Sequence, residues 1–369
     1  MPEVSSHVRS LKQSVYASLA EKMKALPEPP IGLHLGDTYA VPPAAARWEG
    51  LDLSSPGNYR YSHPSGLPVL LEELATKLVR ENGLAATADW VQVTCGATHA
   101  LHSAVHTLLQ PDDGILILSP YWPLFGGMVR CLGAVEHEVT FEDLEMRPGV
   151  KALYFANPNN PDGRVYTREE LERLASFACE HDLWVISDEC YEHYLYDGNR
   201  HISIASLPGM SERTVSVYSF SKSYAMAGHR VGYLCAHPQV MLWLRRLTNH
   251  SIYNLSPSLQ KAALAVLREG DAFVKEWSPQ YASARNRMAE VVHAPKPQGG
   301  AYFFPRFENA ERAWDFVERA LQAGVAVAPG AAFGDAYANY VRICFTCVDE
   351  PTLEKACVIL GRLGHNQGG

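Results

Sequence analysis

Residues 215–236 read VSVYSFSKSYAMAGHRVGYLCA and contain two short apolar runs around a polar centre. The runs at 215–219 and 231–236 have the length, and the branched and aromatic residues, of buried strands. Between them, Lys222 stands among three serines and Arg230 stands between two glycines. Lysine is seldom buried without a reason, and a desolvated lysine is a nucleophile toward aldehydes. The planar fork of an arginine suits a phosphate. Taken alone, the two residues also fit a solvated lysine and an ion-paired arginine.

Short apolar runs also occur upstream, where they alternate with helical patterns. This alternation is typical of a mainly parallel sheet covered on both faces. We therefore predict an α/β fold whose large domain has a mainly parallel seven-stranded sheet between helices, followed by a small α+β domain. The further strands are expected at 91–94, 115–119, 134–139, 152–156 and 183–187, and the helices at 68–82, 98–109, 168–180 and 238–249.

The two ends of the chain are predicted to form the smaller part. A helix is expected over 5–25, and two helices at 256–268 and 272–290 lead into the C-terminal unit. Chain termini often lie close together, so the N-terminal segment is expected to pack with the small domain. The expected elements of that domain are strands at 301–304, 325–328 and 340–345 and helices at 311–323 and 350–363. The expected parts are an N-terminal segment (1–45), a large domain (46–275) and a small domain (276–369).

Composition excludes several classes of protein. Apolar residues make up 47% and charged residues 20%, which is ordinary for a globular chain and unlike a disordered or fibrous one. The chain has 32 basic and 40 acidic residues, for a formal charge of −8. This charge argues against nucleic acid or an anionic membrane surface as a partner.

The eight cysteines are scattered through apolar stretches and suit a reducing compartment, so we expect a cytoplasmic protein. The one close pair, Cys344 and Cys347, is interpreted as two small buried residues rather than a redox or zinc pair. The first thirteen residues contain no apolar signal segment, and no apolar run approaches the ~18–20 residues that span a bilayer.

Polar residues follow the ends of four predicted strands, where ligands bind in parallel sheets. Residues 96–98 open a helix whose free N–H groups could bind a phosphate. Asn160 lies in the loop 157–163, and Asp188 and Tyr191 follow a wholly apolar strand. Each alone also fits a turn, a surface loop or a helix cap. Together with the lysine and arginine of the first motif, they are the parts that hold pyridoxal 5′-phosphate (PLP).

The chain resembles the fold-type I PLP-dependent aminotransferases of class I/II, nearest their aspartate and aromatic branch. The resemblance covers about Gly36 to the C-terminus. SFSKSYAMAGHRVGY (219–233) is similar to the family pattern S-x-S-K-x-x-x-x-x-G-x-R-x-G-Y. NPNNPDG (157–163) resembles N-P-x-N-P-T-G, and SDECYEHY (187–194) resembles the D-E-x-Y strand end. Asp162 replaces the usual threonine, for which we expect only a local effect on the loop.

The resemblance implies three catalytic residues. Lys222 forms a Schiff base with the cofactor and, as a free amine, moves the proton between Cα and the cofactor. Asp188 pairs with the pyridinium nitrogen. Tyr191 and Asn160 hydrogen-bond the 3-oxygen of the ring.

The resemblance also implies the other cofactor contacts. Trp122 stacks on the ring, with Tyr121 as the alternative. Tyr61 reaches the phosphate of the neighbouring subunit, which implies a homodimer with shared active sites. The phosphate is expected to be bound in its own subunit by Gly96, Ala97, Thr98, Ser219, Ser221 and Arg230.

For the substrate, the resemblance implies that Arg342 binds the α-carboxylate, helped by Asn160 and by the backbone at Gly36. No second arginine is evidently placed for a dicarboxylate, and an aromatic or apolar side chain is slightly favoured. The weighed arginines are Arg60, Arg245 and Arg246. The aromatic residues expected near the site are Tyr39, Tyr59, Tyr121, Trp122, Phe125 and Tyr253.

The predicted function is transfer of the amino group of an L-amino acid to a 2-oxo acid in a ping-pong cycle. The alternative keeps fold and cofactor but ends in C–S or β-elimination, decarboxylation or oxygen-dependent oxidation. A PLP-binding regulator is disfavoured because the chain lacks a basic DNA-binding extension. A nicotinamide-binding protein is disfavoured because no G-x-G-x-x-G follows the first strand.

Overall fold

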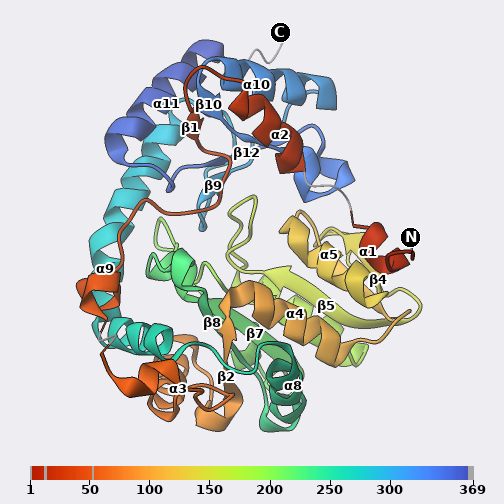
Figure 1. Ribbon diagram of the computed structural model, residues 1–369. Coiled ribbons are helices and arrows are strands. Elements are labelled where there is room, and N and C mark those ends of the chain that lie inside the picture. The colour runs from red at the N-terminus through yellow and green to blue at the C-terminus, as the bar shows by residue number, and fades with distance from the viewer. Residues whose placement is uncertain (1, 12–14, 52–53, 365–369) are drawn as a thin grey trace.

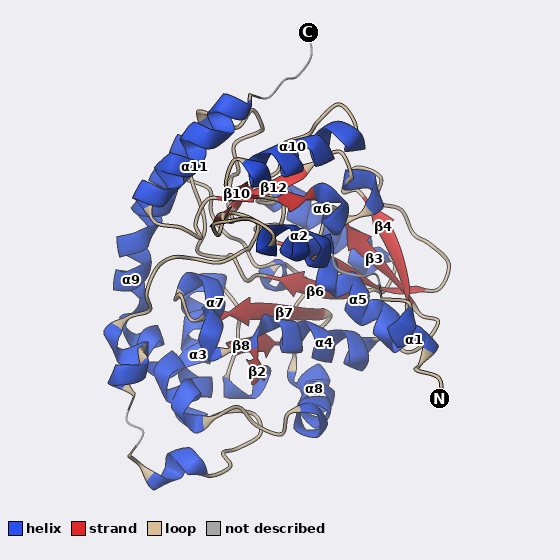
Figure 2. Ribbon diagram, turned by 45° about the horizontal axis from the view of Figure 1, so that its top comes forward, coloured by secondary structure: helices blue, strands red, loops and turns tan. Residues whose placement is uncertain are grey.

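A seven-stranded sheet with helices around it forms the framework of the larger part of the protein (Figures 1 and 2). The computed structural model describes residues 2–11, 15–51 and 54–364. The strand order is β2-β8-β7-β6-β5-β3-β4, and all neighbours are parallel except β8, which is antiparallel to β2 and β7. The predicted α/β class is confirmed, and all seven predicted runs are strands of this sheet. The strands are β2 (Val91–Cys95), β3 (Gly114–Leu118), β4 (Val135–Val139), β5 (Val150–Ala156), β6 (Trp184–Asp188), β7 (Thr214–Ser219) and β8 (Val231–Cys235).

Helices cover both faces of the sheet because successive residues of its strands point to opposite faces. In β5, Ala152 and Tyr154 belong to an apolar cluster with helices α4, α5 and α8, whereas Leu153 and Phe155 belong to a cluster with α6. Helix α3 packs in a third cluster with β2 and β8. The helices are α3 (Pro68–Asn82), α4 (Gly96–Leu108), α5 (Pro123–Leu132), α6 (Arg168–Glu180), α7 (Phe220–Ser223) and α8 (Pro238–Ser251). Short 3₁₀ helices lie at 44–46, 48–50, 56–59, 88–90, 204–206, 227–229, 330–333 and 335–337.

One long helix, α9 (Pro257–Ala289), runs along one side of the molecule (Figure 1). The prediction of two helices here was wrong. Gly270 resembles a helix stop in the sequence, but a Cβ at this position would lie 2.7 Å from the Tyr224 ring. The glycine therefore lets the helix pack closely instead of ending it. Pro279 also lies inside α9, where the buried residues Trp277 and Tyr281 flank it and anchor the helix.

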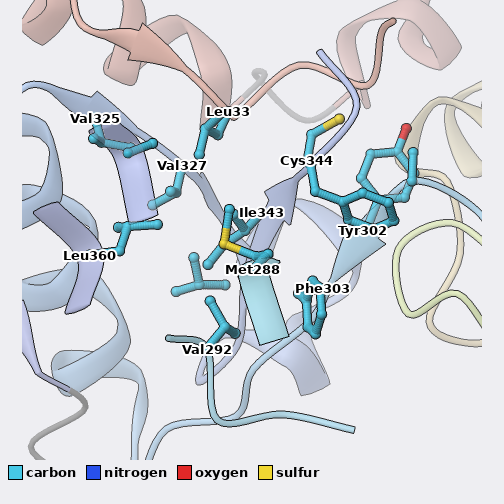
Figure 3. Close-up of a cluster of buried hydrophobic side chains, with 14 of the residues drawn as sticks. Leu33, Met288, Val292, Tyr302, Phe303, Val325, Val327, Ile343, Cys344 and Leu360 are labelled. Carbon is cyan, nitrogen blue, oxygen red and sulfur yellow. The ribbon is translucent and has the colours of Figure 1, made fainter. Parts of the chain in front are cut away.

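The C-terminal residues form a fourth apolar cluster with two small sheets (Figure 3). Strands β11 (Ala328–Pro329), β12 (Val341–Cys344) and β9 (Tyr302–Phe303) form an antiparallel sheet. Strand β10 (Val325–Ala326) pairs in parallel with β1 (Ile31–Gly32). The predicted strand 325–328 is therefore two short strands, because the chain changes sheets at Val327. Helices α10 (Ala310–Gln322) and α11 (Glu350–Leu363) complete the unit.

The N-terminal segment contributes Leu19 and Leu33 to this C-terminal cluster (Figure 3 shows Leu33). The single helix predicted over 5–25 was wrong, because α1 (Ser6–Arg9) and α2 (Val15–Lys24) are separate helices. Residues 12–14, which belong to the predicted helix, lie outside the described part of the chain. The three-part domain division stays a prediction, and its boundary at 275/276 falls inside α9. Among the described helices, none is long and apolar enough to cross a bilayer.

Candidate active site

A cavity of about 960 Å³ lies where the ends of β5, β6 and β7 meet the starts of α4 and α5 and the C-terminal unit. Its volume is at the upper end of the range typical of ligand sites. It brings together most of the predicted site residues, although they come from distant parts of the chain. The predicted residues that line it are Gly36, Ala97, Thr98, Trp122, Asn160, Asp188, Tyr191, Ser219, Ser221, Lys222, Arg230 and Arg342.

Lys222 lies in the four-residue helix α7, directly after β7. Its Nζ donates a hydrogen bond to the carbonyl oxygen of Gly36 and lies 4.0 Å from Oδ1 of Asp37. Burial lowers the pKa of Lys222, and the nearby negative charge of Asp37 opposes part of that effect. A lysine with a lowered pKa spends more of its time as the neutral amine, which is the nucleophilic form.

Asp188 ends β6, and its side chain is only 8% exposed. Oδ1 accepts a hydrogen bond from the Cys190 backbone N–H (3.2 Å), and Oδ2 accepts one from the Tyr154 hydroxyl (3.4 Å). Burial raises the pKa of Asp188. Among the described residues, no cation forms an ion pair with this carboxylate. A protonated pyridine nitrogen would supply the missing positive charge and favour its ionised form.

A cradle for an anion lies between α4 and Arg230. Gly96 has φ +69°, and a Cβ there would lie 2.6 Å from Nη2 of Arg230. A Cβ at Gly232 would lie 2.8 Å from the backbone nitrogen of Ala97. The two glycines thus allow the first turn of α4 to approach the guanidinium group. The backbone N–H groups of Ala97 and Thr98 lie in that first turn, where a helix provides no internal partner for them.

Two serines flank this cradle. Ser219 Oγ accepts a hydrogen bond from the Ser221 backbone N–H (3.1 Å) and caps α7. Arg230 Nη1 donates to the Ala227 carbonyl oxygen (3.0 Å), which orients the guanidinium group. The donors of this cradle and the uncompensated carboxylate of Asp188 fit the phosphate and the pyridine nitrogen of PLP. Gly96, which was predicted as a cofactor contact, does not itself line the cavity.

Arg342 on β12 is 4% exposed and is held from several directions. Nη1 donates to Oδ1 of Asn160 (3.0 Å), and Nη2 donates to the carbonyl oxygen of His34 (2.7 Å). The guanidinium group also lies over the rings of Tyr302 (4.3 Å) and Phe333 (4.7 Å). A planar cation fixed in this way suits bidentate binding of a carboxylate.

The loop that carries Asn160 is held by its own side chains. Asp162 Oδ1 accepts hydrogen bonds from the Asn159 side-chain amide (2.8 Å) and from the Arg164 backbone N–H (3.1 Å). Asn159 also donates to the Pro120 carbonyl oxygen (2.9 Å). The aspartate that replaces the usual threonine therefore acts within the loop.

Tyr302 is a site residue that sequence reasoning missed. Its hydroxyl shares a hydrogen bond with that of Tyr191, and both side chains line the cavity. Burial is the largest cause that raises the pKa of Tyr191, and the nearby Tyr302 raises it further. A Cβ at Gly36 would overlap the Tyr302 hydroxyl, so the glycine allows the N-terminal segment to pass over this ring. Tyr302 follows two glycines in GGAYFF, a signal too common to identify it.

Both aromatic residues weighed for the ring face, Trp122 and Tyr121, line the cavity. Trp122 is half-buried. Tyr121, the alternative, is 5% exposed, and its hydroxyl donates to Oε1 of Glu138 (2.9 Å). Tyr61 is 83% exposed, packs edge-to-face on Tyr253 at 5.0 Å and does not line the cavity of its own chain.

The arginines weighed for a second carboxylate do not line the cavity. Arg245 donates to backbone carbonyls of Ala88 and Val91, and Arg246 stacks on the ring of Trp243. Arg130, which sequence reasoning missed, does line it and is ion-paired with Glu136. Because Arg130 lies on α5, far from every motif in the sequence, only the fold could identify it.

Comparison with known proteins agrees with this geometry. The family described as aminotransferase class I and II matches residues 30–360. An aspartate/prephenate aminotransferase of Thermus thermophilus is 36% identical over 337 residues, covering 83% of this chain and 84% of that protein. Aromatic-amino-acid aminotransferase 2 of Thermococcus litoralis is 35% identical over 325 residues, covering 81% of this chain and 82% of that protein.

A solved structure shares the whole fold. A double mutant of the Thermus thermophilus aspartate aminotransferase matches with a TM-score of 0.90 and 32% identity, covering 98% of this chain and 100% of that chain. The predicted cofactor, reaction class and fold type are therefore confirmed at the level of the family. This chain belongs to the class I and II aminotransferases, which are PLP-dependent enzymes.

Proposed function

We propose that Lys222 is the lysine that bonds to PLP and that Arg342 orients the amino acid in the same cavity. The observation that carries this proposal is the pairing of a lysine of lowered pKa, whose side chain is only 17% exposed, with a buried, fixed arginine in one cavity. PLP, when bound, supplies an aldehyde for the substrate amine and a ring that accepts the electron pair released at Cα. The substrates are an amino acid and a 2-oxo acid.

Each remaining residue has a role in holding these groups. Arg342 and Asn160 bind the α-carboxylate and thereby fix the direction of the Cα–H bond. Lys222, as a neutral amine, would take the Cα proton and pass it to the cofactor in the first half of the cycle, and would move a proton in the opposite direction in the second half. Asp188 holds the pyridine nitrogen in its protonated form, and Tyr191 with Asn160 binds the 3-oxygen. Trp122 covers the ring. The phosphate contacts are Ala97, Thr98, Ser219, Ser221 and Arg230, and Gly96, which lacks a Cβ, allows the Arg230 guanidinium to approach the start of α4.

We further propose an aromatic or apolar substrate side chain. Arg130 lines the cavity, but Glu136 compensates its charge. Glu138 also lines the cavity, where it accepts a hydrogen bond from the Tyr121 hydroxyl and adds a negative charge. A carboxylate on the substrate side chain would be repelled there, whereas a ring would contact apolar residues such as Leu35. The Thermococcus litoralis relative, which is named for aromatic amino acids, supports this choice.

The test compares phenylalanine with aspartate in the first half of the cycle. We expect a higher kcat/KM for phenylalanine, and we expect Glu138→Gln to raise the aspartate-to-phenylalanine ratio about tenfold. The estimate is about 1.4 kcal/mol for unit charges ~6 Å apart at an effective dielectric constant of ~40. Glu180→Gln at the exposed end of α6 makes the same change of charge as a control. A wild-type preference for aspartate would overturn the side-chain class and leave amino transfer intact.

We propose a homodimer in which Tyr61 serves the site of the neighbouring subunit. Tyr61, Tyr59 and Tyr253 are exposed by 83%, 78% and 46%, which is unusual for large rings unless a partner covers them. In a shared site, Tyr61→Ala inactivates the site of the neighbouring subunit, whereas Lys222→Ala inactivates the site of its own subunit. Mixing the two variants after dissociation should restore about a quarter of wild-type activity, through hybrids with one intact site. A monomer with full activity, or mixtures as inactive as the parents, would contradict the shared site.

We also propose a cytoplasmic location. All eight cysteines are free thiols, which suits a reducing compartment.

A further inference from the structure

The segment 188–194, DECYEHY, contacts two different environments. Asp188, Cys190 and Tyr191 line the active-site cavity. Glu192 and His193 instead line a second, smaller cavity of about 370 Å³. The sequence motif therefore carries a second set of polar residues to which the proposed reaction assigns no role.

A buried ion pair lies at the centre of this second set. Lys77 on α3 is 4% exposed, and its Nζ lies 2.5 Å from both carboxylate oxygens of Glu192. Asn82 accepts from Lys77 (2.9 Å) and donates to Glu192 (2.9 Å). Lys77 Nζ is also 3.8 Å from Oε2 of Glu81. These contacts fix the position of the Glu81 carboxylate one helical turn along α3.

His193 connects that carboxylate to the lysine loop. Its Nε2 lies 3.2 Å from Oε2 of Glu81, and its Nδ1 lies 2.8 Å from Oγ of Ser223. Burial alone would raise the pKa of Glu81, but the His193 hydrogen bond, the charge of Lys77 and the Arg80 hydrogen bond lower it to about 2. An ionised carboxylate only accepts hydrogen bonds, so Nε2 donates to Glu81 and, in the neutral ring, Nδ1 accepts the Ser223 hydroxyl proton.

The backbone around Lys222 depends on such contacts. Helix α7 has only four residues, too few to be stable by its own hydrogen bonds. The Lys222 carbonyl oxygen accepts from the Tyr194 hydroxyl (3.3 Å), and the Ser223 carbonyl oxygen accepts from the Trp277 indole (3.1 Å). The His193–Ser223 bond is the side-chain contact that completes this support.

We propose that His193 is a positioning residue for the reaction. Through Ser223 it fixes the backbone from which the Lys222 amine reaches the cofactor and the substrate Cα. The buried pair of Lys77 and Glu192 acts behind it by fixing Glu81. This inference rests on the proposed role of Lys222. It assigns to the second half of the DECYEHY motif a function in proton transfer rather than in stability alone.

The test uses the PLP-loaded enzyme and variants that remove the same bond from either side. His193→Ala and Ser223→Ala should each lower kcat for phenylalanine at least about tenfold with little change in KM, since small misplacements of a catalytic group are costly. Each should shift the apparent pKa of the visible cofactor band by about half a unit or more. The double variant should be no worse than either single variant, because both remove one bond. His193→Asn, which keeps an acceptor for Ser223, should recover most of kcat.

Further readouts separate positioning from stability. Hydrogen exchange of the amides at 220–224 should become faster in His193→Ala, while the melting temperature stays close to that of the wild type. His181→Ala at the end of α6 is the control histidine. Unchanged kcat and band pKa in both Ser223→Ala and His193→Ala, additive losses in the double variant, or a His193→Asn variant as impaired as His193→Ala would overturn the inference. If Lys222→Ala retains the wild-type band, the proposed function fails instead.

Discussion

Replacing Arg342 by alanine should remove recognition of the α-carboxylate. Arg342 is 4% exposed, bonds to Asn160 and to the His34 carbonyl, and lies between two aromatic rings. Truncating one partner of a buried, hydrogen-bonded charge pair costs about 2–5 kcal/mol. At about 1.4 kcal/mol per tenfold, the expected loss of affinity is about 30-fold to several thousand-fold.

The assay compares two donors that differ only in the carboxylate. Single-turnover rates are measured against concentration for phenylalanine and for phenethylamine, and the ratio of their kcat/KM values reports recognition of the carboxylate. Arg342→Ala should lower this ratio by the factor above while leaving phenethylamine nearly unaffected. Arg342→Lys, which keeps the charge but loses the planar fork, should fall between wild type and alanine.

Two controls make the comparison decisive. The melting temperature and the visible cofactor band must show that the variant is folded and loaded, because alanine leaves space beside Tyr302 and Phe333. An unchanged apparent affinity for phenylalanine in a folded variant would remove Arg342 from the carboxylate site. Equal losses for amino acid and amine would mean that the arginine acts on the fold of the site instead.

Three further predictions concern the cofactor and the charge network. Lys222→Ala should lose the wild-type visible band and turnover, and borohydride should no longer attach the cofactor to the chain. A variant that keeps the visible band and turnover would refute the role of this lysine. Gly96→Ala should weaken PLP binding at least about tenfold by equilibrium dialysis, because the new Cβ would lie 2.6 Å from Arg230. Gly149→Ala has a similar positive φ but no atom within 4 Å, so an equal loss there would assign the effect to backbone strain. Glu81 has a folded pKa of about 2 against an ordinary 4.5, so its stabilisation is complete above about 4.5 and is lost as the pH falls toward 2. Urea unfolding measured across this pH range should show a smaller loss of unfolding free energy at acid pH in Glu81→Gln than in the wild type, by at most about 3 kcal/mol. An unchanged pH dependence would contradict the assignment.

Much of the fold could be predicted because its signals are local. The seven apolar runs are short, and residues such as Val215 and Val217 are buried, as expected for a strand whose two faces are both covered by helices. Local signals failed where packing overrides propensity. Two helices were predicted at 256–268 and 272–290, but Gly270 lies inside one continuous helix, where the absence of a Cβ leaves room for the ring of Tyr224.

The residues of the candidate site were found where one motif carries several of them. Lys222 and Arg230 lie in one stretch, so their spacing could be compared with a pattern. Tyr302 could not be found in this way, because its contacts with Tyr191 and Arg342 join three distant segments. Their meeting depends on tertiary packing that no local spacing encodes.

The charge balance of the cavity was hidden for the same reason. Arg130 is unremarkable in the sequence of α5, and its pairing with Glu136 depends on β4 lying beside that helix. The sequence could indicate that a second arginine was missing from the motifs. It could not indicate that an arginine lines the cavity with its charge already compensated.

The most direct test of amino transfer is the half-reaction. The PLP-loaded protein is mixed with single aromatic, acidic, aliphatic and basic amino acids, in the presence and in the absence of oxygen. Pyridoxamine phosphate and ammonia are both quantified. We predict stoichiometric pyridoxamine phosphate and 2-oxo acid without ammonia, fastest with an aromatic amino acid and independent of oxygen. Ammonia release with the starting cofactor spectrum restored would contradict amino transfer and indicate elimination, or oxidation if the release requires oxygen.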